Sequence, residues 1–99
     1  MLLGPDGQIV SKMTWEKFAL YQRWDEWPER KDDPPMTVDF SFFKDGKLYY
    51  CTSEDRGFVI VDKDWNRLGY NKNLLKLLET PIWDGKSFHD CIDEILFEE

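Results

Sequence analysis

The sequence predicts an α+β fold: an N-terminal helix, an antiparallel β-meander of three or four strands, and then a short helix and a C-terminal helix packed on one sheet face. Two observations support this prediction. The stretch Met36–Asp62 alternates apolar and polar residues around an Asp45-Gly46 turn, whereas the flanking segments place apolar residues at helical spacing. With 99 residues, the chain is long enough for a single domain, 1–99, with one small core.

The Asp45-Gly46 dipeptide fixes the register of the first hairpin. It suits a two-residue type I′ turn, in which both central residues need a positive φ. Because side chains alternate across a strand, this register divides the hairpin into two faces. One face is apolar and needs a cover; it consists of Val38, Phe40, Phe42, Tyr49 and Cys51. The other face is mixed and is expected to be partly solvated; it carries Asp39, Ser41, Phe43, Leu48, Tyr50 and Thr52.

Further strands are expected on both sides of this hairpin. A third strand is predicted at Phe58–Val61 and a fourth at Arg67–Tyr70, after a turn at residues 62–66. At the start of the chain, residues 1–12 are expected to form an extended arm, in which Ile9-Val10 could add a short edge strand.

The first two predicted helices lie before and after the meander. The first begins at Thr14, a suitable N-cap, and runs to about Trp27, where Pro28 ends it. Its apolar residues occupy two opposite arcs, so it either lies between two layers or keeps one aromatic side exposed. Asn71 or Asn73 caps a short helix that is rich in leucine.

The predicted C-terminal helix has the clearest pattern. Ser87 and Asp90 form an approximate capping box at its start. The apolar residues of one arc are Phe88, Cys91, Ile92, Ile95 and Leu96, and those of the reverse arc are the acidic residues Asp90, Asp93 and Glu94. We therefore expect this helix to lie on the sheet with its carboxylates outward.

The composition argues against several functions. Twenty acidic residues against thirteen basic ones give a net charge of −7, which nucleic-acid phosphates and anionic lipids repel. No apolar run reaches the length of a membrane span and the first residues do not resemble a signal peptide, so a cytoplasmic location is expected. In that compartment Cys51 and Cys91 are expected as buried, reduced thiols.

No catalytic or metal-binding motif is complete. Asp62, Asp64 and Asn66 begin like a calcium loop, but Arg67 stands where that loop needs glycine. The single histidine, His89, has no nucleophile at a suitable spacing, since residues two apart on a helix point in nearly opposite directions. The sequence therefore predicts neither an enzyme nor a cofactor nor a metal site.

Two surpluses point to a protein partner. Aromatic residues make up 16% of the chain, and Asp84–Glu99 contains six acidic residues against one lysine. Aromatic anchors within a charged rim are typical of protein interfaces. The predicted partner-binding residues are Trp15, Trp24, Trp27, Asp90, Asp93, Glu94, Glu98 and Glu99. Their expected partner is a basic protein surface, such as a toxin or a nucleic-acid-binding effector.

One segment also carries a family resemblance. Ile82-Trp83-Asp84-Gly85-Lys86-Ser87, followed by Ile92-Asp93-Glu94-Ile95, resembles the end of small, acidic, uncharacterised proteins of Gram-positive bacteria and their phages. The resemblance covers about the last fifth of the chain. It implies a stoichiometric inhibitor, either a toxin-immunity protein or a phage-encoded antagonist of a host nuclease or defence complex. It assigns a role to no individual residue.

Two other functions stay open on the sequence alone. The chain could be a structural or assembly subunit, as a monomer or as a homodimer formed through the second aromatic side of the helix over residues 14–27. Less favoured is an enzyme with a small-molecule pocket between helix and sheet.

Overall fold

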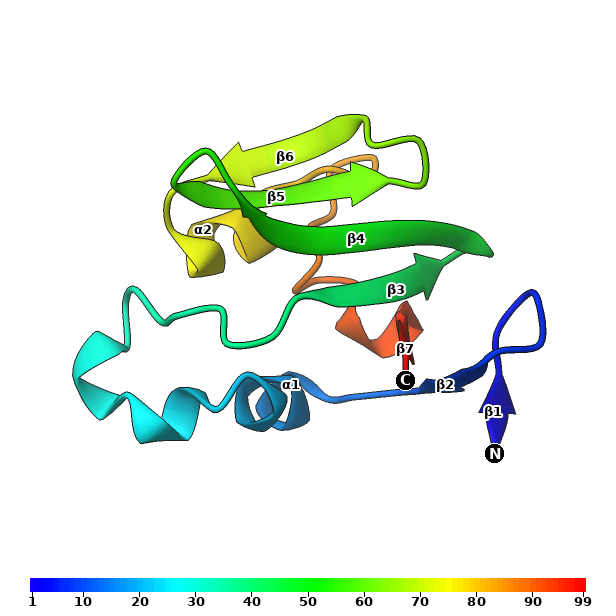
Figure 1. The fold of residues 1–99 in the computed structure, drawn as a ribbon, viewed down its shortest axis with the longest axis horizontal. Helices are drawn as coiled ribbons and strands as arrows, with labels where there is room; N and C mark the ends of the chain where they lie inside the picture. Colours follow the sequence, from blue (N-terminus) through cyan, green and yellow to red (C-terminus); the bar gives the residue numbers. More distant parts are fainter.

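The computed structural model, which describes residues 1–99, shows one seven-stranded antiparallel sheet (Figure 1). The strand order is β1-β2-β7-β3-β4-β5-β6. The strands are β1 (Leu2–Leu3), β2 (Ile9–Ser11), β3 (Phe40–Lys44), β4 (Lys47–Glu54), β5 (Gly57–Asp62), β6 (Arg67–Asn71) and β7 (Leu96–Glu98). The helices are α1 (Trp15–Tyr21), α2 (Leu74–Glu79) and the 3₁₀-helices η1 (Trp24–Glu26), η2 (Pro28–Arg30) and η3 (Ile92–Glu94). The predicted architecture of a long N-terminal helix, a three- to four-stranded meander and a C-terminal helix is therefore wrong.

The hairpin at the centre of the prediction is confirmed in detail. Phe42 pairs with Tyr49, and Phe40 with Cys51, as the turn requires. Asp45 and Gly46 both have positive φ, at 54° and 77°. The strands predicted at 58–61 and 67–70 are present as β5 and β6.

The predicted C-terminal helix is absent. Ser87 and Asp90 do exchange hydrogen bonds, because the Ser87 N–H donates to the Asp90 carboxylate (3.0 Å) and the Asp90 N–H to the Ser87 hydroxyl (3.1 Å). The chain then passes through η3 into β7, which pairs with both β2 and β3. Two effects favour the strand. Pairing on both sides satisfies its backbone groups, and a helix would have placed Glu98 and Glu99 at the negative end of its dipole.

The N-terminal arm is more deeply integrated than predicted. Ile9-Val10 was expected at a sheet edge, but β2 lies between β1 and β7, so the edge strand is β1. The last residue adds to this pairing, since the Glu99 N–H donates to the Ile9 carbonyl (3.2 Å).

The first helix begins as predicted but ends early. The Thr14 hydroxyl accepts a hydrogen bond from the Lys17 N–H (3.2 Å), and the helix ends at Tyr21. The next residue, Gln22, is fully buried, and its amide binds the chain that enters β3. Its Nε2 donates to the Val38 carbonyl (2.8 Å), and its Oε1 accepts from the Thr37 and Val38 N–H groups (2.9 and 3.1 Å). Gln22 thus fixes the residues that precede β3.

The core lies on one face of the sheet only. It consists of Phe18, Phe40, Phe42, Tyr49, Cys51, Ile60, Leu74, Leu77, Leu78, Phe88, Cys91, Ile95 and Phe97. The Phe18 ring of α1 lies at the centre, with its centroid 5.2 Å from that of Phe40, 5.3 Å from Phe88 and 5.7 Å from Phe97. The predicted apolar face of the hairpin is therefore confirmed for Phe40, Phe42, Tyr49 and Cys51, whereas Val38 precedes β3 and lies outside this core.

The opposite face of the sheet has no helix over it. In Figure 1, α2 and the orange segment that follows it lie behind β4–β6, and no helix lies in front of these strands. Four buried residues lie on this side, outside the main core: Val10, Phe43, Val59 and Val61. The two valines of β5 have larger cross-strand neighbours, since Tyr50 is paired with Val61 and Tyr70 with Val59. We call this side the open face.

Truncation of Phe18 should test the position of the core. Phe18→Ala should lower the free energy of unfolding by about 3–5 kcal/mol, because it leaves a cavity among several aromatic rings. Leu20→Ala on the same helix is the matched control; Leu20 is 60% exposed, so a change within about 0.5 kcal/mol is expected. Urea denaturation of both variants measures the difference, and equal losses would contradict this core.

Candidate functional site

Two of the three predicted tryptophan anchors hold the fold together. Trp15 stacks on His89 with a ring-centroid distance of 4.0 Å and lies 5.8 Å from Trp24. Trp24 meets Phe18 edge-on at 5.7 Å, and its Nε1 donates to the Pro35 carbonyl (2.8 Å). Both indoles are only partly exposed. Either could reach a partner only through the part of the ring that this packing leaves free.

Trp27 is the predicted anchor that is accessible. It is 39% exposed, and the Arg30 guanidinium lies 5.9 Å from its ring centroid. Trp24 and Trp27 line one shallow hollow, which also contains Arg30 and Lys31. Asp25 also lines it, so two cations stand against one carboxylate, and this hollow suits a basic partner less well than an anionic hollow would.

The predicted acidic residues do not form one surface. Asp90 binds Ser87, and Asp93 and Glu94 belong to η3. Glu98 lies on the open face, where its carboxylate accepts a hydrogen bond from the Ser41 hydroxyl (2.7 Å). Glu99 follows β7 at the end of the chain. Of the five, Glu98 is therefore the one placed on the face that lacks a cover.

The open face carries an aromatic pair that was absent from the predicted site. The rings of Tyr50 and Trp65 stack with centroids 5.3 Å apart and an angle of 6° between their planes. Trp65 is 63% exposed, the highest fraction among the five indoles. We call this pair the aromatic platform. Residues 62–66 were predicted as a polar turn only, and the signal that could have found the platform is a tryptophan within such a turn.

The backbone of Trp65 is strained. Its φ is 65°, in the left-handed region that disfavours a large side chain by about 1–2 kcal/mol. Asp62 holds the turn in place: its carboxylate accepts from the N–H groups of Asp64 and Asn66 (both 2.9 Å) and from the Asn66 side-chain amide (3.1 Å). Such strain persists only where surrounding contacts impose it, and it is concentrated at functional sites.

A hollow of about 270 Å³ lies beside the aromatic platform. It is lined by Asp39, Phe40, Ser41, Tyr50, Cys51, Thr52 and Trp65. The Asp39 carboxylate accepts from the Thr52 hydroxyl (2.9 Å), in the register that continues the β3–β4 pairing. Asp39 directly follows the residues that Gln22 fixes. The hollow is therefore aromatic on one side and anionic at its rim, and no lysine or arginine lines it.

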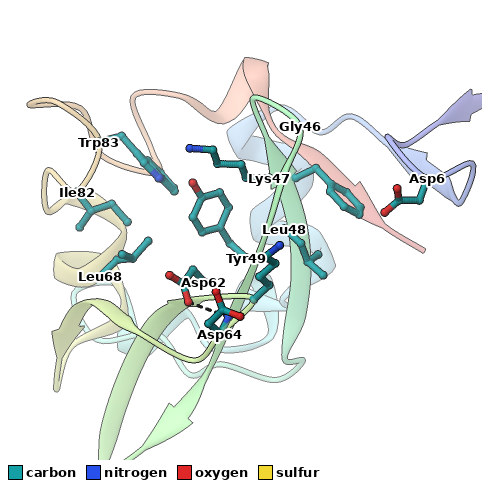
Figure 2. A pocket seen from close by; sticks show the side chains of 12 residues that line it. Asp6, Gly46, Lys47, Leu48, Tyr49, Asp62, Asp64, Leu68, Ile82 and Trp83 are labelled. Carbon is teal, nitrogen blue, oxygen red and sulfur yellow. Dashed lines mark hydrogen bonds between the residues drawn. The ribbon is translucent and has the colours of Figure 1, made fainter.

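A larger cleft of about 580 Å³ lies around the β3–β4 turn. In Figure 2, Trp83 and Ile82 face Tyr49 and Lys47 across it, and Asp62 lies below. Two lysines and three aspartates line this cleft: Lys47, Lys63, Asp6, Asp62 and Asp64. Hydrogen bonds from Asn66 already occupy the Asp62 carboxylate and hold its pKa below the ordinary value. With charges of both signs, the cleft favours neither an anionic nor a cationic ligand.

The remaining candidate groups lie inside the fold. Cys51 and Cys91 are both buried, as predicted, and burial raises the pKa of each thiol. A thiol with a raised pKa is a poor nucleophile at neutral pH. No cluster of three or more histidine, cysteine or carboxylate side chains is placed to hold a metal ion. No helix has the length and apolar character needed to cross a membrane.

Replacement of Trp65 by a residue that tolerates left-handed backbone should test whether its indole is structural. Trp65→Asn should change the free energy of unfolding by less than about 1 kcal/mol, because relief of strain offsets the lost stacking on Tyr50. Urea denaturation measures this change. A loss as large as that of Phe18→Ala would show that the indole supports the fold.

Acid should destabilise the protein through the same turn. Because the hydrogen bonds lower the folded-state pKa of Asp62, its contribution to stability is present above the pKa of the unfolded chain, at about 3.9, and is lost as pH falls through the lowered value. Unfolding free energies measured from pH 7 to pH 2 should fall below about pH 4, and less steeply in Asp62→Ala. Asp64→Asn is the matched control, since it removes a carboxylate from this turn but no hydrogen bond. An Asp62→Ala profile parallel to wild type would contradict this account.

Comparison with known proteins adds no relative: no family model matches the chain, and no curated protein and no solved structure is significantly similar to it.

Proposed function

We propose that this protein is a non-catalytic, acidic protein-binding module that binds a basic protein surface and occludes it. The observation that carries the proposal is the aromatic platform of Tyr50 and Trp65, which is exposed on a sheet face without a helical cover. Aromatic side chains surrounded by a polar rim are frequent anchors of protein interfaces. Asp39 and Glu98 supply such carboxylates next to the platform.

The net charge supports a basic partner. A charge of −7 on a domain of 99 residues creates a long-range field that accelerates the approach of a positively charged surface. Asp90, Asp93, Glu94 and Glu99 would contribute to this steering from outside the platform. Trp65 replaces all three predicted tryptophans as the proposed anchor. Packing within the fold occupies much of the Trp15 and Trp24 rings, and Arg30 and Lys31 lie in the hollow that Trp27 lines.

A narrower role follows from the resemblance of the C-terminal segment and is part of this proposal. The protein would act as a stoichiometric inhibitor in the cytoplasm, as a toxin-immunity protein or as a phage-encoded antagonist of a host nuclease or defence complex. Its mechanism would be occlusion, in which carboxylates of this chain meet lysine and arginine side chains that otherwise contact nucleic acid.

One observation favours a second candidate, an assembly subunit. The edge formed by β1 and its neighbour β2 exposes four apolar side chains: Met1, Leu2, Leu3 and Ile9. An exposed apolar sheet edge can pair with a second copy of the same chain. Light scattering of the wild type and of Leu3→Lys distinguishes this candidate, because a dimer that the lysine disrupts would support it.

Binding to a purified partner should test the main proposal. Proteins captured from a host lysate by the immobilised chain would be identified and purified, and their binding measured by calorimetry and stopped-flow fluorescence. We expect a basic partner at a one-to-one ratio, with association that slows steeply as salt is added. Trp65→Asn should weaken the complex by at least about tenfold.

Trp27→Asn is the matched control for this experiment, because Trp27 is the other exposed indole. Its complex should be unchanged. Capture of acidic proteins only, binding that is insensitive to salt, or loss of binding in Trp27→Asn but not in Trp65→Asn would each overturn the proposal.

A further inference from the structure

We infer that the hollow beside Trp65 receives an arginine side chain of the partner. This inference rests on the proposed function, which it deepens by naming the chemical group that the site recognises. It follows from four properties of the open face: the chemistry of the hollow, its size, the strain in the turn, and the place of the chain's own cations.

The lining of the hollow matches a cation. The stacked rings of Tyr50 and Trp65 form one wall, and an indole face attracts a positive charge through its quadrupole. Asp39 lies at the rim, and Glu98 is bound to the lining residue Ser41. Each of these carboxylates accepts one hydrogen bond from a neighbouring hydroxyl, which orients it and leaves further lone pairs free.

The size and shape favour a single side chain. At about 270 Å³ the hollow is smaller than the usual pockets for small molecules, which span about 300–1,000 Å³. A guanidinium is planar, so it can stack on the rings and still donate to carboxylates at its edge. A lysine ammonium could donate to the carboxylates, but it is not planar and could not stack on the rings.

The strain in the turn fits a preorganised anchor. Asp62 holds Trp65 in a left-handed conformation that glycine or asparagine would adopt more easily. The indole is therefore held against Tyr50 before any partner arrives. Binding to a group that is already ordered avoids the entropy of fixing a mobile side chain.

An arginine on the open face is already bound within the chain. Arg67 pairs across the sheet with Val61 on the open face, yet its guanidinium is engaged by the carboxylates of Glu54 and Asp55. The lining of the hollow itself contains no basic side chain. Its negative charge is thus left for a group from outside.

Short peptides can test this inference on the full-length protein. The probes are Gly-Arg-Gly, Gly-Lys-Gly and Gly-citrulline-Gly with blocked ends, titrated against ¹⁵N-labelled protein by NMR. The arginine peptide should shift the Trp65 indole N–H and the amides of Tyr50 and Thr52. It should bind at least about fivefold more tightly than the citrulline peptide, which has nearly the same shape without the charge. The lysine peptide should fall between the two.

Two variants and one control locate the binding. Trp65→Asn should abolish the shifts, and Asp39→Asn should weaken binding by at least about threefold. Trp27→Asn should leave binding unchanged. Equal binding of the arginine and citrulline peptides, or shifts centred on Trp27, would overturn the inference. If a purified partner needs Trp65 but the arginine peptide is not preferred, the proposed function stands and only this inference fails.

Discussion

The structure depends on the insertion of β7 between β2 and β3. This strand joins the N-terminal arm to the hairpin meander, and without it the sheet would divide into two separate pieces. It also brings Phe97 opposite Phe42 and into contact with Phe18, so the same three residues that complete the sheet also complete the core. Backbone pairing and side-chain burial thus favour the same arrangement at this position, which is typical of sequences that specify one fold.

The exposure of the candidate site follows from where the helices lie. α1 and α2 are short, and both pack on the core side of the sheet, through Trp15, Phe18, Leu74, Leu77 and Leu78. On the open face, the large side chains of Tyr50 and Tyr70 lie beside the buried valines Val61 and Val59. The aromatic platform extends beyond its strand, because the turn after β5 carries Trp65 back over Tyr50. A single-sided cover therefore produces both the stability of the core and the accessibility of the proposed binding surface.

The sequence predicted those parts of the fold that local chemistry determines. The Asp45-Gly46 turn fixed which residues face the core, and Asn73 caps α2 because its side chain can accept from the Lys76 N–H. Residues 87–97 were misassigned because their apolar positions suit a helical arc as well as an extended segment, in which Ile95, just before β7, and Phe97, within it, point to the same side. Only the distant partner strands β2 and β3 decide between the two, and these contacts cannot be read from local spacing.

Which aromatic residues are exposed could not be predicted from local spacing either, for a related reason. Counting aromatic residues revealed a surplus but could not tell that His89 would cover Trp15, or that Phe18 would meet Trp24. The face that carries Asp39, Ser41, Tyr50 and Thr52 was assigned correctly as a mixed surface. This face is a candidate binding surface because Trp65 lies over it. That placement results from the positive φ of Trp65, which the spacing of apolar residues does not predict.

The pairing of β2 with β7 has a consequence for folding during synthesis. Residues 10–11 pair with residues 97–98, so this contact joins segments that are far apart in the sequence and is expected to form late in folding. Until then β2 can pair only with β1. The sheet can therefore close only after residues 96–98 have left the ribosome and reached β2.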